Sequence, residues 1–198
     1  MEELLHFLNN ISPLGPSPII TKPLSAELQA HLRAIIKQKT VAKNQFLLQA
    51  GEISREVYFI KEGLLRCFIQ GDDLKEVNRW FMTEGDVVFS IRSFHQQVPG
   101  DEFIQALEPS ALWYITYLEL EEIYLKFPEF ERVGRLLEIR YHILWDQQYF
   151  GVQMKTAQQR LEWLRTYFPR LPQRVAQKHI ASWLGISEEH YSVIKGLR

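Results

Sequence analysis

The chain contains, at residues 177–195, the stretch QKHIASWLGISEEHYSVIK, which predicts two short helices joined by a tight turn. Ala181 supplies the small residue that two steeply packed helices need at their closest approach, and Gly185 supplies a turn residue that tolerates positive φ. Ser187 stands where the second helix needs an N-cap, ahead of acidic residues in its first turn. The apolar face beneath both helices would consist of Ile180, Leu184, Ile186 and Ile194. This pattern is typical of a helix-turn-helix, whose second helix enters the major groove of DNA. An ordinary helical hairpin at the end of a globular domain is the alternative.

Basic residues are concentrated in the same part of the chain. Residues 155–198 carry eight Lys and Arg against three Asp and Glu, a net charge of +5. Because the whole chain carries −1, residues 1–154 carry −6. Positive charge is what binding to DNA phosphates requires, and an acidic remainder would help to orient the protein on DNA. A solvated charged face is the alternative.

Composition excludes several classes of site. The 198 residues allow one large or two modest domains. Cys67 is the only cysteine, so the chain can form no internal disulfide and no cysteine-ligated zinc or iron-sulfur site, and we expect a small buried strand residue there. No apolar run approaches the roughly 18 residues of a membrane span, and the acidic N-terminus lacks a secretion signal. We expect a cytoplasmic protein without membrane contact.

Residues 1–118 predict a β domain preceded by helices. Ser25 can cap a helix that runs through Leu28, Leu32, Ile35 and Ile36, and residues 12–18 have the composition of a loop. From Thr40 to Thr116, short segments rich in β-branched, leucine and aromatic residues each end at a turn signal. The predicted strands are 46–48, 57–60, 64–69, 77–82, 87–89, 103–107 and 112–115. Their even spacing favours a small antiparallel barrel or jelly roll, and we interpret residues 1–118 as a sensory domain.

A helical period returns after Tyr117 and predicts an α+β chain with a long central helix. We interpret residues 119–154 as a connecting and dimerisation segment, and residues 155–198 as an all-α domain that contains the helix-turn-helix. Apolar residues recur at intervals of seven along the central segment and predict a seam with the same helix of a second subunit. The seam residues are Val133, Leu136, Leu137, Ile143, Leu144 and Phe150. Packing of this face on the chain's own barrel is the alternative.

The order of barrel, long helix and helix-turn-helix resembles the Crp/Fnr superfamily of bacterial regulators, whose sensory domain has the cyclic-nucleotide-binding fold. Three segments carry the resemblance, which covers nearly the whole chain: 51–63, the turn 84–86 and 177–195. The glycines Gly51, Gly63 and Gly85 fall where the barrel of this family makes its tight corners. The resemblance therefore implies a homodimeric, DNA-binding transcriptional regulator.

The ligand cassette departs from the family pattern. In relatives that bind cyclic AMP, a Gly-Glu pair reaches the ribose and a later Arg-Ser pair holds the cyclic phosphate. Here Ser90-Ile91 occupies the region of the first pair, and Glu102-Phe103 that of the second. A glutamate repels the anion that an arginine would clamp, so we expect no tight binding of cyclic AMP. The candidate pocket residues are Phe89, Ser90, Ile91, Arg92, Ser93, Glu102 and Phe103.

The DNA-reading positions depart from the pattern too. The resemblance places the family's two arginines at Glu188 and Val193, while the glutamate between them is retained as Glu189. Losing bidentate arginines removes contacts worth roughly 1 to 3 kcal/mol each in base discrimination. The chain stops at Arg198, without residues for the β-hairpin wing of larger relatives, so we expect a compact, wingless form that binds weakly and salt-sensitively. The candidate DNA contacts are Lys178, Ser187, Glu188, Glu189, His190, Ser192, Lys195 and Arg198.

Two other classes of function are alternatives to a regulator. An interaction or small-ligand sensor protein without sequence-specific DNA binding would explain the altered cassette and the altered recognition helix. An enzyme on a cupin-like barrel would need clustered His and carboxylate ligands, yet His95 is the only histidine between residues 32 and 141. We therefore expect no enzyme, no catalytic residues, no metal and no cofactor. A small-molecule effector other than cyclic AMP stays open.

Overall fold

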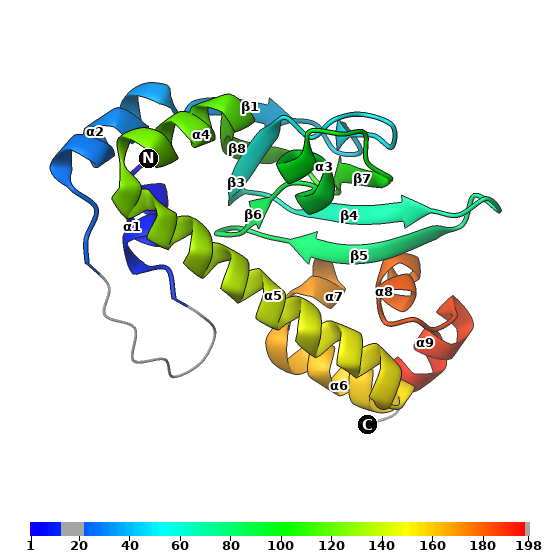
Figure 1. Cartoon of the computed structure of the whole chain (residues 1–198). Coiled ribbons are helices and arrows are strands. Elements are labelled where there is room, and N and C mark those ends of the chain that lie inside the picture. The colour runs from blue at the N-terminus through cyan, green and yellow to red at the C-terminus, as the bar shows by residue number, and fades with distance from the viewer. Residues whose placement is uncertain (13–21, 197–198) are drawn as a thin grey trace.

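The computed structural model describes residues 1–12 and 22–196 (Figure 1). The predicted loop at 13–18 and the candidate contact Arg198 lie outside the described residues. The strands are β1 (Lys37–Val41), β2 (Phe46–Leu48), β3 (Glu56–Glu62), β4 (Leu65–Gln70), β5 (Glu76–Met82), β6 (Val87–Val88), β7 (Glu102–Ala106) and β8 (Ser110–Thr116). The helices are α1 (Glu2–Asn10), α2 (Ala26–Ile35), α3 (Ile91–Gln96), α4 (Tyr117–Lys126), the 3-10 turn η1 (Pro128–Phe130), α5 (Glu131–Met154), α6 (Ala157–Tyr167), α7 (Leu171–Arg174), α8 (Gln177–Trp183) and α9 (Glu188–Gly196).

The strands form two antiparallel four-stranded sheets that face each other. One sheet has the order β1-β8-β3-β6 and the other β2-β7-β4-β5. Alternate residues of both sheets, such as Tyr58, Ile60, Cys67 and Ile104, point inward and form one buried cluster. The fold class and the predicted strands are confirmed, and Cys67 is a buried strand residue as expected.

Glycines make the sheet corners. Gly51, Gly63 and Gly85 have φ values of +88°, +116° and +86°, where a side chain would be strained. At Gly63 a Cβ atom would lie 2.7 Å from the Cα atom of Ser110. A side chain at this position would therefore clash with backbone, and a small shift would not relieve the clash. The glycine pattern in the sequence thus located the turns correctly.

Helices cover the outer face of the β1-β8-β3-β6 sheet. Phe59 and Trp113 on that face share a buried cluster with leucines of α1 and α2, and with Ile123 of α4. Ser25 caps α2 as predicted, because its hydroxyl oxygen accepts a bond from Leu28 N at 3.2 Å. This layer closes one side of the barrel (Figure 1).

The first half of α5 corrects the predicted dimer seam. Val133 and Leu136 are 2% and 1% exposed and belong to the cluster under α1 and α2, with Leu137 packed against it. The hydroxyl of Tyr141 then holds α5 to the barrel by accepting from Val87 N at 2.7 Å. The sevenfold repeat therefore serves the protomer's own core at this end of the helix. Seven-residue spacing alone does not distinguish packing against a second subunit from packing against the chain's own barrel, because both would bury the same face of the helix.

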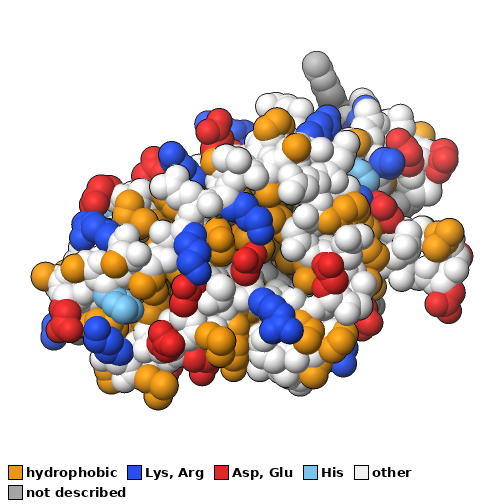
Figure 2. All heavy atoms as spheres, turned by 90° about the horizontal axis from the view of Figure 1, so that it is seen from above, with side chains coloured by type: hydrophobic (Ala, Val, Ile, Leu, Met, Phe, Trp, Pro, Cys, Tyr) orange, Lys and Arg blue, Asp and Glu red, His pale blue; other side chains and the backbone are white. Residues whose placement is uncertain are grey.

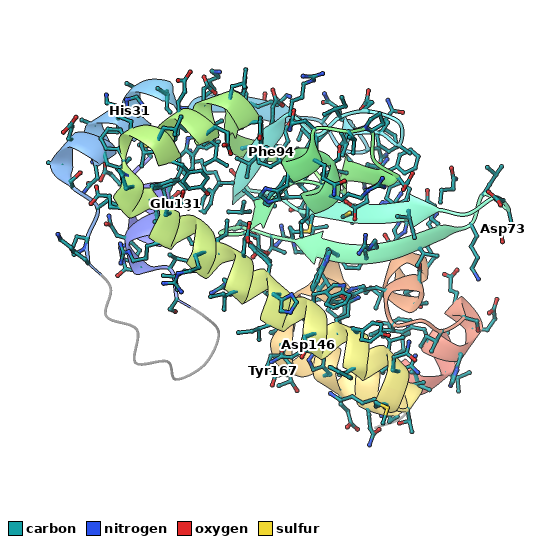
Figure 3. All side chains as sticks on the ribbon, viewed as in Figure 1. His31, Asp73, Phe94, Glu131, Asp146 and Tyr167 are labelled. Carbon is teal, nitrogen blue, oxygen red and sulfur yellow. The ribbon has the colours of Figure 1, made fainter. Side chains whose placement is uncertain are left out.

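Two elements were absent from the sequence prediction. Strand β1 carries only one buried residue, Val41, and its lysines gave no hydrophobic alternation. Helix α3 has six residues and is held by Phe94, which is 1% exposed and packs edge-on against Tyr117 at 5.3 Å (Figure 3). Both elements depend on contacts with distant strands rather than on a local pattern.

Candidate functional site

The segment 177–196 forms two short helices joined by a tight turn, as the sequence pattern predicts. Gly185 has φ +67°, and Ile186 N donates to the Ala181 carbonyl at 3.0 Å to close the turn between α8 and α9. Ser187 caps α9, since its Oγ accepts from His190 N at 3.1 Å. The predicted apolar face is present, with Ile180, Leu184 and Ile194 buried and Ile186 partly buried.

This helix pair is docked on the barrel. Helix α8 lies against β5 on the outer face of the second sheet (Figure 1), and Leu64 and Phe81 of the barrel share one buried cluster with residues of α6, α8 and α9. Trp183 is at its centre, 2% exposed, with its ring edge-on to Phe81 at 5.3 Å and to Phe168 at 5.3 Å. The barrel and the helix-turn-helix thus share a hydrophobic core.

Side chains of α8 complete the edge of β5, which is an end strand of its sheet. Ser182 Oγ donates to the Glu76 carbonyl at 3.0 Å and accepts from Asn78 N at 3.0 Å. Trp183 Nε1 donates to the Arg79 carbonyl at 2.9 Å. Backbone groups that an edge strand would leave unpaired are therefore satisfied by the helix. The docking fixes the position of α8 along the strand as well as its distance from it.

A buried arginine lies beneath α8. Arg66 of β4 is 4% exposed and donates to Gln105 Oε1 from Nε at 2.9 Å and to Glu76 from Nη1 at 2.5 Å. The same Nη1 lies 3.0 Å from Nδ1 of His179 on α8, and Asn78 Nδ2 lies 3.4 Å from that atom. Because Arg66 has only donors, Nδ1 of His179 must accept, so the imidazole is neutral with its proton on Nε2.

We expect the stability of the folded protein to fall as pH falls from about 6.5 to about 4. Burial, followed by the positive charges of Arg66 and Lys178, lowers the pKa of His179 from 6.5 to about 4. Between these values the unfolded chain binds a proton that the folded chain does not bind, so the free energy of unfolding drops by about 3 kcal/mol across the interval and is level above it.

Urea denaturation at a series of pH values would measure this effect in the wild type and in His179→Gln. Subtracting the two profiles removes the titration of carboxylates, and His190→Gln, at an exposed histidine of α9, is the matched control. Parallel profiles for the wild type and His179→Gln would contradict the assignment of a neutral His179.

A second ionic contact joins the same parts of the chain. Arg174 at the end of α7 binds both carboxylate oxygens of Glu84, at 2.8 and 2.9 Å, and also pairs with Glu108. The bond to Arg174 lowers the pKa of Glu84 to about 2, with a smaller contribution from Gly63 N. Both acids stand at barrel corners, so Arg174 holds the helices at a defined edge of the barrel.

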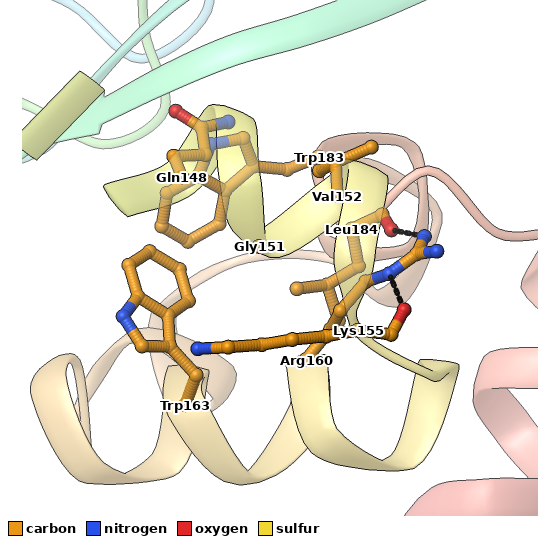
Figure 4. Close-up of a pocket in the computed structure, with 8 residues that line it drawn as sticks. All are labelled: Gln148, Gly151, Val152, Lys155, Arg160, Trp163, Trp183 and Leu184. Atoms are coloured by element: carbon orange, nitrogen blue, oxygen red, sulfur yellow. Dashed lines mark hydrogen bonds between the residues drawn. The ribbon is translucent and has the colours of Figure 1, made fainter. Parts of the chain in front are cut away.

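The basic residues of the C-terminal segment are partly structural. Arg160 donates to the Lys155 carbonyl at 2.9 Å and to the Leu184 carbonyl at 2.7 Å, and so joins α6 to the end of α8 beside a cavity of only about 10 Å³ (Figure 4). Arg165 donates to the Lys195 carbonyl at 2.9 Å, at the end of α9. Arg160, Arg165 and Arg174 all have partners within the chain, so fewer basic side chains are available to bind phosphates than the net charge of +5 suggests.

The candidate DNA-contact residues of α8 and α9 form an exposed surface. All those within the described residues are solvent-exposed, and Val193 beside them is 64% exposed. They are Lys178, Ser187, Glu188, Glu189, His190, Ser192 and Lys195. Hydrogen bonds from its own backbone N–H and from the Ser187 side chain lower the pKa of Glu189, so it is ionised at neutral pH. The start of α9 is therefore negative, and the lysines lie toward its far end and on α8.

The barrel face turned away from α8 and α9 gathers no charge of one sign. Seen from above, basic and acidic side chains are interspersed on it (Figure 2). This face offers no extended positive surface to a nucleic acid.

The structure brings together only some of the candidate pocket residues. Ser90 donates to Glu102, and Arg79 of β5 donates to the same carboxylate at 2.6 Å. Ser93 is buried, and its Oγ accepts a hydrogen bond from Ser54 N at 2.9 Å. Phe89 packs on Phe94.

The other three candidate pocket residues point elsewhere. Ile91 is 61% exposed, and Arg92 pairs with Asp101 on the surface. Phe103 stacks on Phe68 outside the barrel. Arg79 was absent from the sequence prediction, since its strand neighbours gave it no charge partner.

A cleft of about 440 Å³ opens at another place, between the β2–β3 loop and β7. Its walls are Leu47, Leu48, Glu52, Ile53, Ser54, Arg55, Glu56, Tyr58 and Ile104. Lys39 extends to its edge, bonded to Glu56 and lying 5.3 Å from the Tyr58 ring centre. Burial, and then the hydrogen bond to Glu56, raises the pKa of Tyr58, so its hydroxyl stays protonated. No sequence motif indicated this cleft, because its residues are spread over three strands.

Among residues 1–12 and 22–196, no three His, Cys, Asp or Glu side chains are grouped so as to hold a metal ion. In the same ranges, no helix is both long and apolar enough to cross a membrane.

Comparison with known proteins identifies the barrel. A family model described as the cyclic nucleotide-binding domain matches residues 38–127. Patatin-like phospholipase domain-containing protein 6 of mouse and that of human are each 25% identical to this chain, in an alignment 185 residues long that covers 88% of this chain. The chain spans only 13% of the length of these relatives.

Solved structures match most of the chain. The c-di-GMP-responsive global regulator CLP of Xanthomonas campestris superposes with a TM-score of 0.69 at 14% identity, covering 86% of this chain and 89% of CLP. FixK2 of Bradyrhizobium japonicum gives 0.66 at 17% identity, covering 81% and 83% of the two chains. A CooA mutant of Carboxydothermus hydrogenoformans gives 0.63 at 21% identity, covering 88% and 79%. Residues 38–127 therefore resemble a cyclic nucleotide-binding domain, and the chain has a Crp/Fnr-like fold.

Proposed function

We propose that this protein is a cytoplasmic, homodimeric, DNA-binding transcriptional regulator of the Crp/Fnr type. The observation that carries the proposal is the helix-turn-helix itself: α8 is docked on the barrel, while the face of α9 that would read DNA is exposed. A helix presented in this way can enter a major groove without rearrangement of its own fold. The Crp/Fnr-like fold supports the same function. In this proposal residues 1–118 are the sensory segment, 119–154 the connecting segment and 155–198 the DNA-binding segment.

The second half of α5 supports a dimer. Trp145, Tyr149, Phe150 and Met154 are 40%, 48%, 54% and 81% exposed. Trp145 and Tyr149 lie one helical turn apart, as do Phe150 and Met154, and the rings of Tyr149 and Phe150 join the two pairs at 5.8 Å. Trp145 stacks on Tyr149 at 5.3 Å, which forms a flat aromatic surface. The predicted seam residue Phe150 lies in this patch, whereas Ile143 and Leu144 are partly buried beside it. The dimer contact we propose is thus shifted toward the C-terminal end of α5.

Tyr149→Glu is expected to shift the protein from dimer to monomer in light scattering at micromolar concentration. A carboxylate in the middle of an apolar interface loses hydration without gaining a partner. Gln147→Glu, which adds the same charge at an exposed position on the side of the helix away from Tyr149, is the control. A dimer that survives Tyr149→Glu unchanged would place the interface elsewhere.

DNA binding is expected to be weak and strongly dependent on salt. Lys178→Ala and Lys195→Ala should each weaken binding to all sequences alike and lower the slope of log K against log salt by about one, because each removes one phosphate contact. Gel retardation of palindromic fragments at low salt measures this, with half-sites about 34 Å apart. Lys43→Ala, an exposed lysine of the barrel, is the control.

A dimeric protein that retards no genomic fragment would contradict DNA binding. Capture of a stoichiometric protein partner in its place would favour the alternative, an interaction or small-ligand sensor protein. The acidic start of α9 and the structural use of Arg160, Arg165 and Arg174 are the observations that favour this alternative.

A further inference from the structure

The carboxylate of Glu102 is bound inside the mouth of the barrel as an anionic ligand would be. Arg79 Nη1 of β5 donates to Oε1 at 2.6 Å, and Ser90 Oγ donates to Oε2 at 2.5 Å. The two donors come from different elements and meet on one carboxylate. Ser90 is 2% exposed and the Glu102 side chain 16% exposed, whereas the Arg79 side chain is 41% exposed, so the group is buried on the side of Ser90 and open to water on the side of Arg79.

The direction of the side chain places this group on the inner side of its sheet. Along β7, Glu102 alternates with the outward-facing Phe103 and shares its side with Ile104 and Ala106, which belong to the barrel's interior cluster. Cys67 of β4 lies next to it, and burial together with the charge of Glu102 raises the pKa of that thiol. The carboxylate is therefore held within the domain that matches cyclic nucleotide-binding domains.

A guanidinium and a hydroxyl that converge on two oxygens bind a phosphoryl group as readily as a carboxylate. A free anion would have to displace Glu102, which is attached to the chain and so is present at a high effective concentration. Competition from the Glu102 carboxylate explains how the barrel can retain hydrogen-bond donors for an anion and still exclude a free anion.

Arg79 also connects this group with the helix-turn-helix. Its side chain holds Glu102, while its backbone carbonyl accepts the indole N–H of Trp183 at 2.9 Å. The preceding residue, Asn78, donates its backbone N–H to Ser182 of α8. Arg79, which binds the Glu102 carboxylate, thus lies on the segment of β5 against which α8 packs.

We propose that Glu102 is a built-in ligand: it fills a phosphoryl-binding site made by Arg79 and Ser90, and it thereby holds β5 in the position that docks α8 without any added effector. Its regulatory meaning rests on the function proposed above, but the occupancy of the site does not. Removing the Glu102 carboxylate opens the site to phosphoryl compounds, and loosens the docking of α8 until one of them binds.

Calorimetry on the full chain tests the occupancy, with inorganic phosphate and cyclic AMP as separate probes. Glu102→Ala is expected to bind at least one of them about tenfold more tightly than the wild type. Phosphate binding alone identifies a site for a free anion, and tighter binding of cyclic AMP identifies a nucleotide site. Asp101→Ala, which removes the exposed neighbouring carboxylate, should behave like the wild type. Equal affinity of the wild type and Glu102→Ala overturns the proposal. The proposal also fails if Arg79→Ala/Glu102→Ala binds the probe as tightly as Glu102→Ala.

Hydrogen exchange of the Trp183 indole N–H, followed by NMR, tests the connection to α8. Exchange should be about tenfold faster in Glu102→Ala than in the wild type, and should slow again with the bound probe. Glu102→Gln keeps the shape of the side chain and serves if the alanine variant does not fold; its weaker hold on Arg79 should still speed the exchange. Unchanged exchange in the variant that folds overturns the connection. Neither measurement uses DNA, so a failure here is distinguishable from a failure of the proposed function.

Discussion

Trp183→Ala is expected to lower the free energy of unfolding by about 3 to 5 kcal/mol. The ring is 2% exposed and lies between Phe81 of the barrel and the aromatic residues Trp163 and Phe168 of the C-terminal helices. Its removal leaves a cavity where the two parts of the chain share their core, and it leaves the Arg79 carbonyl without a donor. Urea denaturation followed by circular dichroism measures the loss.

Trp183→Phe separates the two contributions. Phenylalanine keeps most of the ring contacts and loses the indole N–H, so we expect a loss of about 1 kcal/mol from the missing hydrogen bond plus a smaller packing term. If Trp183→Ala unfolded in two steps, with the barrel melting as in the wild type, the docking would be looser than the shared core indicates. A loss below 1 kcal/mol for Trp183→Ala would contradict the buried position of the ring.

Arg66→Ala is expected to cost about 2 to 4 kcal/mol, the next largest effect. Its removal leaves Gln105 and Asn78 buried with fewer partners, and it leaves Glu76 without its closest cation. Because the charge of Arg66 helps to lower the pKa of His179, the same variant should bring that pKa back toward 6.5. NMR titration of the imidazole measures the shift, and denaturation measures the cost.

Arg66→Met keeps much of the side-chain volume and is the matched control. It should restore the packing but not the hydrogen bonds, so its stability is expected to lie between those of Arg66→Ala and the wild type. A His179 pKa that stays near 4 in both variants would show that burial alone sets it, and would contradict the charge contribution of Arg66.

The local signals in the sequence were reliable where one residue sets the backbone. The glycines Gly63 and Gly185 require positive φ, and the caps Ser25 and Ser187 accept a bond from the following turn. Such features act over four or five residues, so they can be recognised without knowledge of the fold. Every strand except β1 was recognisable in the same way, from a short β-branched or aromatic segment that ends at a turn signal.

Charge and helix seams could not be assigned in the same way. The eight basic residues at the end of the chain indicated a phosphate-binding segment, yet Arg160 and Arg165 bind carbonyl groups at helix ends and Arg174 binds two barrel acids. The partner of an arginine is decided by the groups that folding brings near it, and those groups lie 24 to 90 residues away in sequence. Likewise, the spacing of Val133 and Leu136 is compatible both with a dimer seam and with burial in the core of one protomer.

What the sequence by itself determined is the set of elements and their order: a barrel with glycine corners, a long helix and a helix-turn-helix. What only the tertiary structure decided is how they are joined. The docking of α8 on β5, the pairing of Arg66 with His179 and the binding of Glu102 by Arg79 and Ser90 all join residues from separate elements. Their energies depend on burial and on distances of about 3 Å, which are absent from a linear pattern and arise only when the sheets and helices pack.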